Sequence, residues 1–96
     1  MKHCIGFLAI LSFFLACGHA NADIEWEILN DEVKELYRTG KYDRAIIVAK
    51  KALELAEESG PNNVNVATSL NSLALLYKAQ GEYALAEPLY KRSLKI

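Results

Sequence analysis

The fold is decided by the stretch LALLYKAQGEYALA at residues 73–86. Its first half has the apolar spacing of an amphipathic helix, and Gly81 stands where that helix should end. A second helical pattern begins directly afterwards, at Tyr83. The stretch therefore predicts two helices joined by a short turn around a glycine.

This hairpin pattern occurs twice in the chain. Gly40 and Gly81 lie 41 residues apart. At the same offset further residues of the first half meet an identical residue in the second half: Leu29 and Leu70, Asn30 and Asn71, Tyr42 and Tyr83, Ala45 and Ala86, Lys50 and Lys91, Leu53 and Leu94. A period of this size is typical of stacked helical hairpins. The sequence predicts an all-α fold, an α-solenoid of two stacked helix-turn-helix hairpins.

The first hairpin is expected over residues 23–59. Asn21 or Asp23 is the expected N-cap of its first helix, because either side chain can accept a hydrogen bond from a free backbone N–H. Gly40 is expected to end that helix, and the Gly-Pro pair that ends in Pro61 should stop the second one.

The second hairpin is expected over residues 60–96. Asn63 or Asn65 follows the turn residues and can cap its first helix. Gly81 should end this helix. Pro88 lies inside the last helix, where it removes one backbone donor, so a slight kink or a late helix start is expected there.

Residues 1–22 have the layout of a cleavable signal peptide. A lysine near the start precedes an apolar run over residues 5–16, and the small residues Ala20 and Ala22 flank Asn21 as in a signal-peptidase site. The apolar run is shorter than the roughly 20 residues that a membrane-spanning helix needs. The mature chain is expected to begin at Asp23 and to be periplasmic or secreted.

Cys17 supports an alternative for the same segment. Phe14-Leu15-Ala16-Cys17 resembles a bacterial lipoprotein box, in which the cysteine is lipidated and becomes the new N-terminus. The protein would then be a membrane-anchored lipoprotein. Without lipidation at Cys17, no membrane association is expected.

Composition and residue positions argue against several classes of function. The formal net charge is −1, so a basic face for nucleic acid is not expected. Both cysteines and both histidines, namely His3, Cys4, Cys17 and His19, lie in the predicted leader. The rest of the chain lacks the thiolate and imidazole groups of common metal sites and nucleophilic triads. We expect no enzyme activity, no bound metal and no cofactor.

The chain resembles the tetratricopeptide repeat family over residues 24–96. The second hairpin has the family pattern at Leu73, Ala74, Tyr77, Gly81, Tyr83, Ala86, Tyr90, Ser93 and Leu94. The connector from Gly60 to Leu70 and the segment Ala86-Glu87-Pro88-Leu89-Tyr90 are similar to the longer-period subgroup typified by kinesin light chain. The first hairpin departs from the pattern at Val33, Leu36 and Ala49.

The resemblance implies a module that binds a protein or peptide in a concave groove, which the first helix of each hairpin lines. Asn30 and Asn71 occupy equivalent positions, and such asparagines contact a peptide backbone in the family. Helical spacing places other side chains on the same surface. The predicted peptide-binding residues are Asn30, Lys34, Tyr37, Arg38, Thr68, Asn71, Leu75 and Lys78.

A structural or assembly role is the alternative function. Solenoids usually have three or more repeats and a polar cap, whereas this sequence contains two hairpins. The last helix is then expected to expose its outer face and to self-associate or stack on another helical protein. The chain would alternatively be a truncated piece of a longer repeat array.

Overall fold

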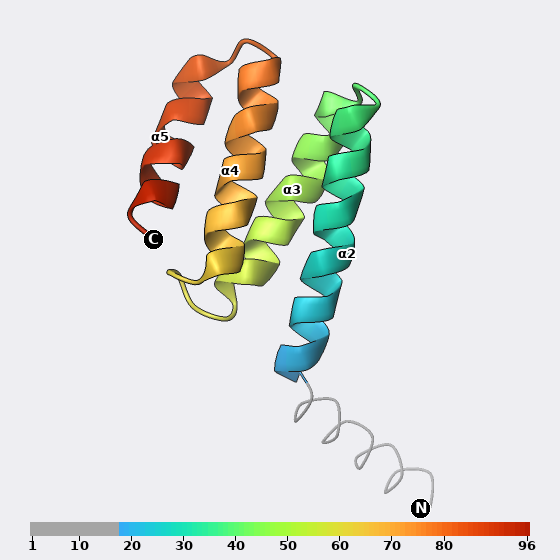
Figure 1. The fold of residues 1–96 in the computed structure, drawn as a ribbon, viewed down its shortest axis with the longest axis vertical. Helices are drawn as coiled ribbons and strands as arrows, with labels where there is room; N and C mark the ends of the chain where they lie inside the picture. The colour runs from blue at the N-terminus through green and yellow to red at the C-terminus, as the bar shows by residue number, and fades with distance from the viewer. Residues whose placement is uncertain (1–17) are drawn as a thin grey trace, which may run out of the picture.

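The computed structural model describes residues 18–96 as four helices, with no strand in this part of the chain. They are α2 (Gly18–Arg38), α3 (Tyr42–Glu57), α4 (Val64–Ala79) and α5 (Tyr83–Leu94). Figure 1 shows them side by side in chain order, with α2 and α5 at opposite ends of the row. The all-α hairpin architecture predicted from the sequence is confirmed.

Two glycine turns close the hairpins in the same way. Gly40 and Gly81 have φ angles of 77° and 79°, a region that glycine adopts without steric cost. The N–H of Lys41 donates to the carbonyl of Leu36, and the N–H of Glu82 donates to that of Tyr77, each at 2.8 Å. These are the bonds of a Schellman motif, which satisfies carbonyls left free at a helix end. The predicted role of both glycines is confirmed.

The connector between the hairpins is held by Asn63. Its Oδ1 accepts from the N–H of Val66 at 3.0 Å, which caps α4. Its Nδ2 donates to the carbonyl of Ala56 at 2.9 Å and to that of Gly60 at 2.7 Å. One side chain therefore ties the end of α3 to the start of α4. Of the two predicted caps, Asn63 is the one used.

The start of α2 differs from the prediction. The helix begins at Gly18, so Asn21 and Asp23 lie inside it and do not cap it. The last helix begins at Tyr83 and runs through Pro88, so it does not start late. Most of the predicted signal peptide, including Cys17, lies outside the described residues. No helix within residues 18–96 is long and apolar enough to cross a membrane.

The core is built mostly from small and aliphatic side chains. On α3, Ala45, Ala49 and Ala52 are buried, which allows neighbouring helices to approach closely. One cluster joins α2, α3 and α4 through residues that include Val33, Val48 and Leu76. A second cluster centres on five other buried residues: Trp26, Ala52, Ala56, Val66 and Leu70. These contacts fix α2 beside α4 and so position the candidate site.

Candidate functional site

A shallow apolar hollow lies where α2 and α4 adjoin. It has a volume of about 130 Å³ and is lined by Val33, Lys34 and Tyr37 of α2 and by Ser72, Leu75 and Leu76 of α4. The residues come from the first helix of each hairpin because α2 and α4 are in direct contact. Leu75 is 41 % exposed, so an apolar side chain faces solvent within the hollow.

A second hollow continues the first toward the turn ends of the hairpins. Its lining consists of Tyr37, Leu75, Lys78, Ala79 and Tyr83. Tyr37 and Leu75 belong to both hollows, so the two form one groove, which we call the α2–α4 groove. Four residues predicted from the sequence meet in this groove, namely Lys34, Tyr37, Leu75 and Lys78.

The two equivalent asparagines differ in their surroundings. Asn30 is only 8 % exposed, whereas Asn71 is exposed to solvent. Neither side chain is among the lining residues of the α2–α4 groove. Asn30 is therefore less accessible to a ligand than Asn71, and the contact of either asparagine with a peptide stays a prediction.

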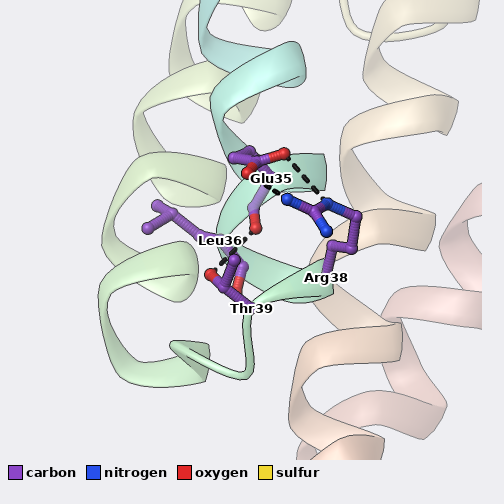
Figure 2. Close-up of polar contacts among 4 residues, drawn as sticks. All are labelled: Glu35, Leu36, Arg38 and Thr39. Carbon is purple, nitrogen blue, oxygen red and sulfur yellow. Dashed lines mark hydrogen bonds and ion pairs between the residues drawn. The ribbon is translucent and has the colours of Figure 1, made fainter.

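Thr68 and Arg38 are engaged within their own helices. The Thr68 hydroxyl donates to the carbonyl of Val64 at 3.0 Å. Arg38 forms an ion pair with Glu35, and its Nε donates to the Glu35 carboxylate at 3.1 Å (Figure 2). Figure 2 also shows the Thr39 hydroxyl, which donates to the carbonyls of Glu35 and Leu36 at the end of α2. Neither Thr68 nor Arg38 lines the groove.

Sequence reasoning missed several lining residues. Val33 and Leu76 were not among the predicted binding residues, yet both of these buried side chains line the first hollow. Tyr83, which was not among the predicted binding residues, is exposed and reaches the groove from the start of α5. Ser72 also lines the first hollow. The predicted helix face included its neighbour Asn71 but not Ser72.

The Glu35–Arg38 pair predicts a measurable shift in acid titration. The hydrogen bond from Arg38, together with its positive charge, lowers the pKa of the Glu35 carboxyl below its usual value. The folded-state pKa is thus below the unfolded one. The small stabilisation from this exposed pair is present above the unfolded pKa and is lost as the pH falls through the folded pKa.

We expect a carboxyl-detected NMR titration to place the midpoint of Glu35 below its value in an Arg38→Gln variant. This variant keeps a long polar side chain but removes the charge. Equal Glu35 midpoints in the two proteins would show that the pair does not form in solution.

Comparison with known proteins identifies one family. A family model described as tetratricopeptide repeat matches residues 36–96, which is more than half of the chain. No curated protein and no solved structure gives a significant match. The matched part runs from the last turn of α2 through α5 and includes both glycine turns. The match does not test the longer-period subgroup, which stays a prediction.

Proposed function

The chain belongs to the tetratricopeptide repeat family, and from this premise we propose that it binds an extended segment of another protein in the α2–α4 groove. The observation that carries the proposal is the exposed apolar lining of a groove between the first helices of the two hairpins. Large apolar side chains at a concave surface indicate a binding site, not a surface that contacts only water.

The open form of the groove favours a peptide over a small molecule. Pockets for drug-sized ligands enclose most of the ligand. The second hollow measures about 310 Å³ and the first about 130 Å³, and both are open to solvent. A cavity of about 150 Å³ holds a benzene-sized group. The first hollow thus fits one aromatic or branched aliphatic side chain, with the rest of the peptide lying along the groove.

Lysines at both parts of the groove favour acidic neighbours for this side chain. Lys34 lines the first hollow, and Lys78 lines the second one. Charges at the rim of an apolar site contribute to partner choice and to the rate of association. We therefore expect the bound segment to carry an apolar residue with aspartate or glutamate on either side. No catalytic step and no cofactor form part of the proposal.

An array of extended peptides, each with one apolar residue between acidic residues, tests this function. We expect Leu75→Ala to weaken the best peptide by about tenfold or more, because the loss of an apolar contact of about 1.4 kcal/mol changes affinity by that factor. Asn71→Ala on the same face tests the predicted asparagine contact.

Ile47→Ala is the matched control for this experiment. Ile47 is an exposed aliphatic residue on α3 and does not line the groove. We expect this variant to bind the peptide as the parent protein does. A peptide that binds the Leu75 and Ile47 variants equally well would show that the groove is not the site.

We also propose that the protein acts outside the cytoplasm. Support comes from the leader-like pattern of residues 1–22, with its apolar run and small-residue cleavage site. Mass spectrometry of the protein isolated from its native host is expected to find Asp23 at the N-terminus, or a lipidated Cys17 in the alternative. A chain that retains Met1 would contradict both forms of export.

A further inference from the structure

The α5 side of the molecule carries a further hollow, which shares Lys78 and Tyr83 with the α2–α4 groove. It has a volume of about 310 Å³, and its lining includes Lys78, Tyr83, Tyr90, Lys91 and Leu94. Tyr83 and Leu94 are 63 % and 86 % exposed, which is high for large apolar side chains. We call this surface the tail face. Apolar surface of this kind usually marks an interaction site.

The first hairpin shows what covers such a surface. At the 41-residue offset, Tyr42 and Leu53 of α3 correspond to Tyr83 and Leu94 of the tail face. Both α3 residues are partly buried and pack against a core cluster that contains Leu73 and Leu76 of α4. The helix that covers the α3 surface is thus the first helix of the following hairpin. A helix in the corresponding place would cover the tail face.

The same offset identifies the side of α2 that corresponds to this covering surface. Four α4 residues are buried within the junction of the hairpins: Val66, Ser69, Leu73 and Leu76. Their counterparts on α2 are Glu25, Ile28, Glu32 and Glu35, and all four are exposed. We call these four residues the head face. Because three of the four are carboxylates, the head face requires a partner with positive charge as well as apolar surface.

Charge differs between the two ends of the row. The helix α2 contains six carboxylates and two cationic side chains, a net charge of −4 without histidine. The helix α5 contains one carboxylate and two cations, a net charge of +1, and Lys78 adds a further positive charge to the tail face. In Figure 1 these helices lie at opposite ends, so the acidic and the basic ends face away from each other.

In the part of the chain that the structure describes, each face has charged residues that are free for a partner, namely Glu25 and Glu32 on the head face and Lys78 on the tail face. Within residues 23–96, Lys91 pairs with Glu87 at 3.1 Å and Glu35 pairs with Arg38, whereas Glu32 and Lys78 make no ion pair. Glu32 stands at the position of Leu73, which packs in the junction between the hairpins. A partner carrying the head face would bring this carboxylate to the hollow that Lys78 lines.

We propose that the tail face of one chain binds the head face of a second copy, so that chains associate head to tail. The junction between the two copies repeats the junction between α3 and α4, which brings Glu32 into the hollow that Lys78 lines. Because the two faces differ, this contact is heterologous and leaves one head and one tail free in each dimer. Longer assemblies then form at higher protein concentration, and added salt weakens them because exposed charges are screened.

The test is a charge exchange, with mass measured by sedimentation over a range of protein concentrations. The protein is the product of the full 96-residue sequence. We expect Glu32→Lys alone and Lys78→Glu alone each to raise the dissociation constant by about tenfold or more. The chain that carries both changes, and an equal mixture of the two single variants, are expected to regain association, since each restores opposite charges on the two faces that meet.

Lys41→Glu is the matched control. It makes the same charge change as Lys78→Glu, but in the exposed turn between α2 and α3, where the second hairpin itself has Glu82. We expect it to associate as the parent does. A parent chain that is monomeric at every concentration overturns the proposal. So does a Glu32→Lys variant that dimerises normally, because that result indicates a symmetric contact between two tail faces.

Discussion

Leu70→Ala is expected to lower the free energy of unfolding by about 2–5 kcal/mol, the usual range for truncating a buried leucine. Leu70 is 0 % exposed and lies in the cluster with Trp26, Ala56 and Val66. Alanines already make up part of this cluster, so neighbouring side chains have little freedom to fill the space. Since small domains have a total stability of roughly 5–15 kcal/mol, the loss is a large fraction of it.

Leu75→Ala provides the matched control in a urea titration followed by far-ultraviolet circular dichroism. It removes the same atoms from the same helix, but Leu75 is 41 % exposed at the groove. We expect a change within about 0.5 kcal/mol, as for other surface substitutions. Equal losses for Leu70→Ala and Leu75→Ala would mean that α4 is rotated relative to the arrangement described above.

The sequence predicted the turns well because their signals are local. Gly40 and Gly81 are each required by a backbone with positive φ, and the requirement depends only on the adjacent helix end. Asn63 likewise caps the residues that follow it directly. The start of α2 was predicted wrongly because Asn21 and Asp23 can cap only where the chain before them leaves the helix. Alanine at positions 20 and 22 has the highest helix propensity, so the helix continues through this segment.

The groove was predicted only in part because exposure depends on neighbours as well as on helix periodicity. The 41-residue offset makes Asn30 and Asn71 equivalent in sequence. However, α2 has α4 beside it, and α4 has no described helix on the corresponding side. Asn30 is consequently buried and Asn71 is exposed. Tyr83 reaches the groove for a similar reason, since nothing in residues 18–96 covers the outer side of the second hairpin.

The hydrogen bond between Trp26 and Ser69 could not be predicted from the repeat. Trp26 is buried, and its partner Ser69 lies on α4. The residues at the 41-residue offset are Ala67 for Trp26 and Ile28 for Ser69. Ala67 and Ile28 both have apolar side chains, so the repeat does not indicate a polar contact between these positions. The bond joins residues 43 apart and depends on how the two hairpins stack, which no local pattern encodes.

Ser69→Ala is expected to destabilise the protein by about 1–3 kcal/mol, the cost of leaving a buried donor without a partner. The indole Nε1 of Trp26 donates to the Ser69 hydroxyl at 2.7 Å, and both residues are buried. Removal of the hydroxyl leaves this N–H facing apolar surroundings in the core. The bond links the first helix of each hairpin, so it stabilises their stacking directly.

A double-mutant cycle separates this hydrogen bond from other effects of the substitution. In a Trp26→Phe background the donor is absent, so Ser69→Ala should cost less than it does in the parent chain, with a coupling energy of about 0.5–3 kcal/mol. Ser72→Ala on the same helix is the matched control, because it brings the same gain in helix propensity without removing a partner of Trp26. If Ser69→Ala costs the same with Trp26 and with Phe at that position, the hydrogen bond does not contribute to the stacking of the hairpins.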